Sequence, residues 1–224
     1  MKIVSCFFTP DFPVPERFLS GMDIFFDIET TGLNEVEDTL LEVGMRVTDW
    51  TGSNVAEPFN QVILPSFWPD LRKEWTGYAW NLHNKNGLIE QIDDLYKLEQ
   101  TNKDMPDWGH RTLEVWRLAR EYINVANDMA GDGNLMLAGS SVHFDKRWLS
   151  RKFSPTLFDR MHHRIMDVSS IRELARHMNP ELYSNEPKKT TDHRAQHCLD
   201  DSIRMFDYYR KAVMGVRSNH DDDE

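Results

Sequence analysis

The sequence of 224 residues has few cysteines, no long apolar run and no excess of positive charge. Its two cysteines, Cys6 and Cys198, are too few for a framework of disulfide bonds, which favours a reducing compartment. No apolar run approaches the length of a membrane span, and the first residues lack the basic-then-apolar order of a secretory signal. We therefore expect a cytoplasmic protein with no membrane partner.

Negative charge dominates the chain, and its distribution limits the kind of ligand. The net charge is −11, and a positive excess occurs only in residues 146–217, with 15 Lys and Arg against 9 Asp and Glu. An acidic body argues against tight binding to long nucleic acid of any sequence. It is compatible with a short anionic ligand that is held by metal ions and a few cationic side chains.

Proline content and charge indicate one domain between two short terminal segments. Residues 1–21 contain Pro10, Pro13 and Pro15 and show no sustained period, so we expect a loosely attached extension, with Met22 as an alternative start. Residues 22–217 form the expected domain, and residues 218–224 form an acidic tail.

Apolar periodicity predicts a sheet covered by helices. Alternating or continuous apolar runs predict strands near residues 24–30, 40–49, 54–64, 135–138 and 165–166. Repeats at three and four residues and capping signals predict helices near residues 88–98, 113–129, 169–177 (with Ser169 as N-cap) and 195–213, and a further helix that carries Asp145 and Trp148. The order of these elements predicts an α/β fold with a mixed central sheet and helices on both faces.

Two acidic residues interrupt the most strongly apolar strand. In the stretch from Ile24 to Leu33, IFFDIETTGL, Asp27 and Glu29 are two residues apart, so their side chains leave the same face of the strand. Two like charges this close are costly unless a cation lies between them. Carboxylate oxygens suit Mg²⁺ or Mn²⁺, which predicts a metal site here. An edge strand with two solvated acids is the alternative, but the flanking aromatic residues argue against solvent.

Four segments, in order, resemble the motifs of one nuclease superfamily. They read FDIETTGL, LAGSSVHFDKRWL, HHRIMDVSSIRELA and HRA…DDSI…YYR, and they cover most of the chain. This pattern resembles the 3′→5′ exonucleases that use four carboxylates and a histidine (the DEDDh group), and among them the oligoribonucleases. The resemblance implies a ribonuclease-H-like exonuclease fold.

By this resemblance, Asp27, Glu29 and Asp145 are ligands of two Mg²⁺ or Mn²⁺ ions. Two such ions bind the scissile phosphate, activate a water molecule and stabilise the leaving oxygen. The reaction needs a base near neutral pH, which suits a histidine. The base is expected at His193, with His197 as the alternative.

The sequence departs from the family at the last acidic ligand. The family has His-x-Ala-x-x-Asp, whereas this chain reads HRAQHC and ends the motif at Cys198. A thiolate is a poor ligand for Mg²⁺. Asp201 lies one helical turn further on nearly the same face, so we expect it to be the fourth ligand if the helix shifts or starts later. Asp200 and Cys198 itself are the alternatives.

The resemblance also implies which residues hold the substrate. Leu33, after the glycine of the first motif, would wedge between bases, and the region of Trp80 and His83 would pack against them. The residues that would bind the 5′ phosphate are Ser141, Arg164, Ser169 and Arg172. In the family, part of this phosphate cap comes from a second subunit, which implies a homodimer.

These features together predict a metal-dependent 3′→5′ exoribonuclease that degrades short single-stranded RNA to nucleoside 5′-monophosphates. One alternative is an exonuclease that acts on DNA or on RNA 3′ ends. An alternative of another class is a catalytically inactive nucleotide-binding protein, whose site was lost with the acid at position 198.

Overall fold

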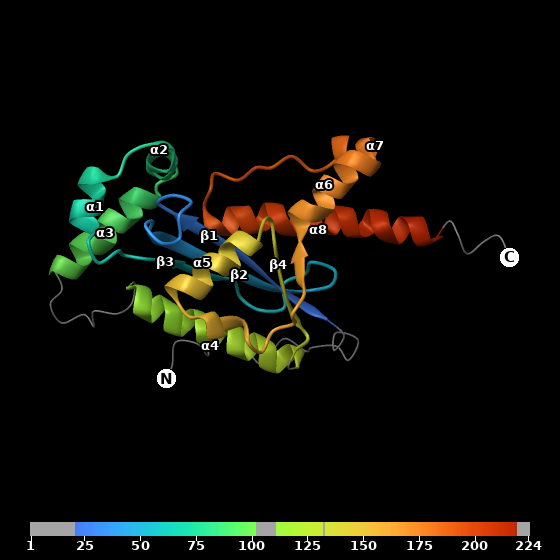
Figure 1. The fold of residues 1–224 in the computed structure, drawn as a ribbon, viewed down its shortest axis with the longest axis horizontal. Helices are drawn as coiled ribbons and strands as arrows, with labels where there is room; N and C mark the ends of the chain where they lie inside the picture. The colour runs from blue at the N-terminus through green and yellow to red at the C-terminus, as the bar shows by residue number, and fades with distance from the viewer. Residues whose placement is uncertain (1–20, 102–110, 132, 219–224) are drawn as a thin grey trace.

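The computed structural model describes residues 21–101, 111–131 and 133–218 (Figure 1). The expected N-terminal extension and acidic tail fall almost entirely outside these described residues. Between them, one sheet has the strand order β3-β2-β1-β4-β5. Its strands are β1 (Met22–Thr30), β2 (Leu40–Asp49), β3 (Phe59–Val62), β4 (Leu135–Gly139) and β5 (Ile165–Asp167).

The sheet is mixed, as predicted. β1 pairs antiparallel with β2, and β2 pairs antiparallel with β3. On its other side β1 pairs parallel with β4, which pairs parallel with β5. The carboxyl ends of β1, β4 and β5 therefore meet at one edge of the sheet.

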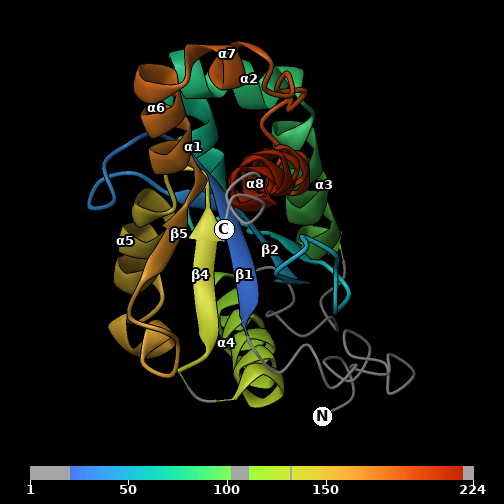
Figure 2. The same ribbon diagram turned by 90° about the vertical axis from the view of Figure 1, so that its right-hand side faces the viewer.

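Helices cover both faces of this sheet, again as predicted. They are α1 (Trp68–Glu74), α2 (Tyr78–Lys85), α3 (Leu88–Thr101), α4 (Thr112–Ala130), α5 (His143–Lys152), α6 (Val168–Met178), α7 (Pro180–Ser184) and α8 (Ala195–Ser218). Figure 2 shows α5 and α8 on opposite sides of the β1–β4 pair. A third group, α1 to α3, gathers at one end of the molecule around Leu41, Trp68 and Ile89 (Figure 1).

The alternation of side chains along β1 separates the two faces. Ile24 and Phe26 pack in the large core with α4 and α5. Phe25 points the other way, into a smaller core with α6 and α8, where its ring meets Phe206 edge-on. Asp27 and Glu29 share the face of Phe25 because side chains alternate along a strand. The two acids therefore face the N-terminal end of α8.

A glycine in the middle of β2 allows α8 to lie close to the sheet. Gly44 pairs with Asp27 across the β1–β2 ladder. A Cβ atom at Gly44 would lie 2.9 Å from Cβ of Ala195 and 3.1 Å from Cδ1 of Leu199. A larger residue here would push the helix away from the two acids.

Some predicted boundaries are wrong, for local reasons. The third strand is only Phe59–Val62, since Asn54 makes an isolated bridge to Thr48 and Pro58 precedes the strand. Helix α6 begins at Val168, and its N-cap is Asp167, whose carboxylate accepts from the N–H of Ser169. The short helices α1, α2 and α7 were not predicted. No helix in the described part of the chain is long and apolar enough to span a membrane.

Asp23, at the start of β1, is a buried acid whose two carboxylate oxygens have no hydrogen-bond partner among the described residues. Burial and the nearby Asp49 raise the pKa of Asp23 from 3.8 to about 7. The folded chain therefore keeps a proton that the unfolded chain releases, so the free energy of unfolding falls as the pH rises from about 4 to about 7.

We expect Asp23→Asn to remove this pH dependence, because the amide does not titrate. Between pH 5 and pH 8 the wild type should lose about 2–3 kcal/mol more stability than the variant. Urea unfolding at the two pH values measures the difference, with the exposed Asp94→Asn as control. Parallel pH profiles of wild type and Asp23→Asn would contradict the assignment.

Candidate active site

Three carboxylates converge where β1 and β4 end. Asp27 and Glu29 leave β1, and Asp145 lies in the first turn of α5. The pairing of β1 with β4 stops at Phe25–Ala138. The N–H of Ile28 lies beyond this ladder and donates to Oδ1 of Asp145 at 3.0 Å, which holds the third acid against the end of β1.

Burial and nearby negative charges raise the pKa of all three acids. Burial is the main cause of the raised pKa of Asp27, and the charges of Asp145 and Glu29 add to it. Burial and Glu42 raise the pKa of Glu29. Burial also raises the pKa of Asp145, against the hydrogen bond from Ile28. The cluster therefore lacks positive charge of its own and favours a bound cation.

Glu42 lies on β2 beside Glu29 of β1, and an arginine neutralises its negative charge. Its carboxylate is fully buried and accepts from Nε of Arg194 at 3.0 Å and from a terminal nitrogen of Arg194 at 2.9 Å. It also accepts from the backbone N–H of Ala195 at 3.1 Å and from Asn60 at 3.1 Å. Glu42 thereby fixes both the first residue of α8 and the residue before it.

The hydrogen bonds of Glu42 to Arg194 and Ala195 fix where α8 begins, and so determine which residue of α8 faces the acids. Because α8 begins at Ala195 without a shift, Cys198 faces the acids, with its Sγ 3.7 Å from Oε1 of Glu29. Burial and the negative charges of Asp27 and Glu29 raise the pKa of the Cys198 thiol. The thiol is therefore protonated in the absence of a cation.

The structure does not bring Asp201 to this cluster, contrary to the expectation from sequence. Its carboxylate accepts from the N–H groups of Thr190 and Thr191 at 2.7 and 2.9 Å and pairs with Arg204. Asp201 thus holds the segment before α8. Asp200, the alternative, points outward and pairs with Arg46 at 2.5 Å.

His193 lies beside the acids on a constrained segment. One of its ring nitrogens lies within 4.8 Å of a Glu29 oxygen and of the Cys198 sulfur. Its φ of 63° is unusual for a residue with a side chain. Asn86, after α2, donates to the carbonyl of His193 at 2.7 Å, and Thr191 Oγ1 accepts from its N–H at 2.9 Å.

The alternative base, His197, is placed differently. It is exposed, and its Nδ1 lies 2.7 Å from Oδ1 of Asp192. A cavity of about 480 Å³ opens beside His193 and is lined by Leu82, Lys85, Asn86, Thr191, Asp192 and His193. His193 therefore borders both the acids and an open space, as a base at a substrate site must.

Three of the four expected ligand positions carry carboxylates, which suit a hard divalent cation. The fourth carries Cys198, which does not. Oδ2 of Asp27 is buried and has no hydrogen-bond partner among the described residues. An ion bound by Asp27, Glu29 and Asp145 would satisfy this oxygen and relieve their repulsion. The sulfur of Cys198 does not suit Mg²⁺.

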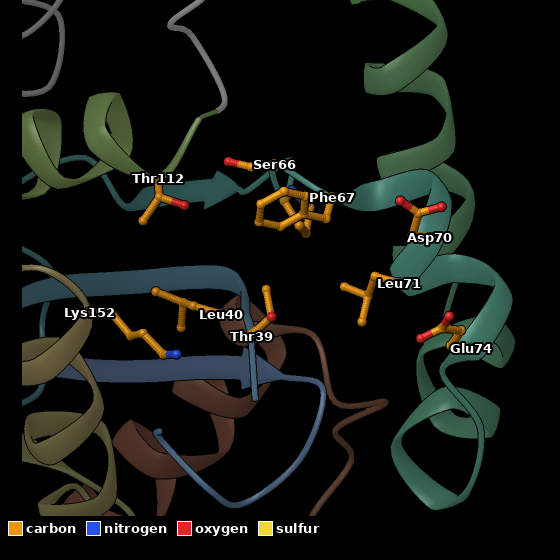
Figure 3. A pocket seen from close by; sticks show the side chains of 10 residues that line it. Thr39, Leu40, Ser66, Phe67, Asp70, Leu71, Glu74, Thr112 and Lys152 are labelled. Atoms are coloured by element: carbon orange, nitrogen blue, oxygen red, sulfur yellow. The ribbon is translucent and has the colours of Figure 1, made fainter. Parts of the chain in front are cut away.

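The loop that carries Leu33 is tied to two helices. Leu33 is 80% exposed. Trp75 Nε1 donates to the carbonyl of Thr31 at 3.0 Å, and Lys152 of α5 donates to the carbonyl of Asp38 at 2.5 Å. Figure 3 shows Lys152 among the residues that line a cavity of about 420 Å³, and none of the predicted site residues lines this cavity. The exposed Leu33 is thus presented on a supported loop.

The Trp80 and His83 region is less accessible than expected. His83 is 1% exposed, and its Nε2 lies 3.1 Å from the carbonyl of Thr30 and 3.7 Å from Oε2 of Glu29. Burial lowers the pKa of His83, so the neutral ring supports the end of β1 instead of stacking on a base. Trp80 packs edge-on against Trp75 and under Arg72.

The predicted phosphate-binding residues separate into two groups. Ser141 and Ser169 lie together, with their Oγ atoms 3.1 Å apart, and Asp167 accepts from both backbone N–H groups. Arg164 is exposed and has no ion pair among the described residues. Arg172 instead pairs with Glu186 and stacks on Tyr183, so its charge is already compensated. Sequence reasoning missed Asp167, although its place before a helix is typical of a cap.

No family model matches this chain. It is 32% identical over 205 residues to the oligoribonuclease of Streptomyces coelicolor, covering 89% of this chain and 90% of the relative. It is 29% identical over 191 residues to the mitochondrial oligoribonuclease of Homo sapiens, covering 85% and 72%.

A solved structure of E. coli exonuclease I with single-stranded DNA, in a zinc-bound form, has a TM-score of 0.51 and is 10% identical. The match covers 89% of this chain and 42% of that one, and it shows a shared fold. The fold, the converging acids and the extent of the sequence match agree, and the chain belongs to the oligoribonuclease family.

Proposed function

We propose that the chain is a metal-dependent 3′→5′ exoribonuclease that degrades short single-stranded RNA to nucleoside 5′-monophosphates. The convergence of Asp27, Glu29 and Asp145 beside His193 carries this proposal. A cation explains three converging acids, one of which has a buried oxygen without a hydrogen-bond partner among the described residues, and proton transfer explains a histidine beside them.

The three acids would hold Mg²⁺ or Mn²⁺, and two ions are proposed. Bound there, such ions neutralise phosphate charge and make water more acidic. His193 accepts the proton of the attacking water, and Asn86 and Thr191 fix the backbone that orients this ring. Leu33 wedges between the bases of the substrate.

A comparison of substrate lengths tests this function. Turnover of a 5′-phosphorylated RNA dinucleotide should exceed that of a twenty-nucleotide RNA and of both DNA counterparts. Faster turnover of the twenty-nucleotide RNA or of DNA would favour a trimming exonuclease. The cysteine at position 198 also favours a second candidate, an inactive nucleotide-binding protein, which absence of turnover with every cation would support.

Arg164 should matter for the shortest substrate. We propose that Arg164, Ser141 and Ser169 bind the 5′ phosphate. Arg164→Ala should then slow cleavage of the dinucleotide about 10–150-fold more than cleavage of a longer RNA, because a charge-assisted contact contributes about 1.5–3 kcal/mol. Arg176→Ala, an exposed arginine of α6, is the matched control. Equal losses on both lengths would contradict this role.

Asp201→Asn should lower stability without removing a ligand. The carboxylate holds Thr190 and Thr191, so the variant should lose about 1–3 kcal/mol in the free energy of unfolding. Turnover below the melting temperature should persist. Unfolding curves and turnover are measured on the same sample, and lost turnover at unchanged stability would restore Asp201 as a ligand.

A homodimer is also proposed. Ile165 of the edge strand β5 and Leu174 and Met178 of α6 are apolar and 37%, 60% and 77% exposed. Sedimentation equilibrium of wild type and of Met178→Asp tests whether this surface joins two copies.

A cytoplasmic location is proposed from the scarcity of cysteine, and cell fractionation tests it.

A further inference from the structure

Three different donor atoms meet beside the carboxylates. A carboxylate oxygen of Glu29, a ring nitrogen of His193 and the sulfur of Cys198 all lie within 4.8 Å of one another. The sulfur and Oε1 of Glu29 are 3.7 Å apart. Within the described residues, this is the group of at least three His, Cys, Asp or Glu side chains whose ligand atoms all lie this close together.

The spacing is close to that of a zinc site. Zinc binds oxygen and nitrogen at about 2.0–2.2 Å and sulfur at about 2.3 Å, almost always in a tetrahedron. Ligand atoms in such a tetrahedron are therefore roughly 3.3–3.8 Å apart. The distance of 3.7 Å between Cys198 and Glu29 already falls in this range. The nitrogen of His193, within 4.8 Å of both atoms, needs to approach by about 1.5 Å at most.

A second observation indicates a missing ligand at the same place. Oδ2 of Asp27 is buried without a hydrogen-bond partner among the described residues, and Asp27 lies within hydrogen-bonding reach of the Cys198 thiol. Asp27 is thus available as a fourth donor. A buried, unpaired carboxylate oxygen is costly unless a cation or a donor satisfies it.

The chemistry of the donors selects the kind of cation. Mg²⁺ requires oxygen ligands and octahedral geometry, which a sulfur and an imidazole do not provide. Thiolate and imidazole ligands suit Zn²⁺ and related ions, and binding releases the thiol proton.

We propose that Glu29, His193 and Cys198, with Asp27, bind a thiophilic divalent cation of the zinc class. The proposal deepens the proposed function and rests on it, since it names a second kind of cation for the same site. While this cation is bound, His193 is a ligand and does not accept the proton of the attacking water. It makes Cys198 a ligand in its own right and not the remnant of a lost acid.

Cobalt and zinc binding to the metal-free full-length chain test this. Added Co²⁺ should give the absorption band of sulfur-to-cobalt charge transfer in the wild type. This band should disappear in Cys198→Ser and in Cys198→Asp. A chromophoric competitor should show that Zn²⁺ binds more than about 100-fold less tightly to Cys198→Ser and to His193→Ala. Cys6→Ser, which changes the other cysteine, should leave both signals intact.

The outcomes separate this inference from the proposed function. A wild type without the cobalt band, or a Cys198→Ser variant that keeps it, overturns the cation site even if RNA is cleaved with Mg²⁺. A band that depends on Cys198 and His193 supports the site even if no RNA is cleaved. His193→Ala, on an exposed segment, keeps the test decisive if Cys198→Ser proves unstable.

Discussion

Asp27→Asn and Glu29→Gln should each reduce metal-dependent turnover more than about a thousandfold. Each carboxylate is expected to contribute several kcal/mol to transition-state stabilisation through the cations that it holds, and a thousandfold corresponds to about 4 kcal/mol. Steady-state turnover of a dinucleotide with Mn²⁺ measures the loss.

The same variants should stay folded and become more stable. Burial and neighbouring acids raise the pKa of Asp27 and of Glu29, so each side chain must take up a proton or remain an unfavourable buried charge when the metal-free chain folds, and a neutral amide avoids this cost. Glu37→Gln, on the loop after β1, is the exposed control. Turnover within tenfold of the wild type in Asp27→Asn would exclude the proposed metal site.

Arg194→Ala should lower the free energy of unfolding by about 3–5 kcal/mol. The variant leaves Glu42 buried without its cation, and breaking a buried pair is strongly destabilising. Removing both charges in Arg194→Ala with Glu42→Gln should recover part of the loss. Urea unfolding of the single and double variants measures this coupling.

An exposed arginine of the same chain provides the matched comparison. Arg117 contacts Glu114 at the surface of α4, with 49% of its side chain exposed. Arg117→Ala should cost less than about 1 kcal/mol. A similar cost for both arginines would show that Glu42 does not depend on Arg194.

The elements with a strong apolar period could be predicted from the sequence. The aromatic run of β1 and the alternation of its side chains placed Asp27 and Glu29 on one face. The stripe of α4 and the motif around Asp145 gave the helices on the other face. These features depend on the spacing of residues that are close in the sequence, so a single sequence is enough to predict them.

The fourth ligand position could not be predicted from the sequence, because it depends on a contact between distant segments. Whether α8 shifts is decided by the bonds from Glu42 on β2 to Arg194 and Ala195, about 150 residues apart in sequence. The one signal was Gly44, since a glycine inside an apolar strand indicates a close approach by another segment.

The sequence also could not predict which individual side chains are buried or paired with an opposite charge. His83 was predicted to meet bases, but it lies under Thr30 and Glu29. Arg172 was predicted to bind phosphate, but Glu186 compensates its charge. Both partners come from segments whose positions only the tertiary fold determines.

The pair of Glu42 and Arg194 also bears on whether the chain needs the proposed metal ions in order to fold. Because an internal arginine already neutralises the acid beside Glu29, we expect the chain to reach its native fold without a bound ion. This differs from small zinc domains, in which folding and metal binding are one event. The proposed ions would then be exchangeable ligands of a finished fold, and the metal that occupies the site would follow the supply in the cell.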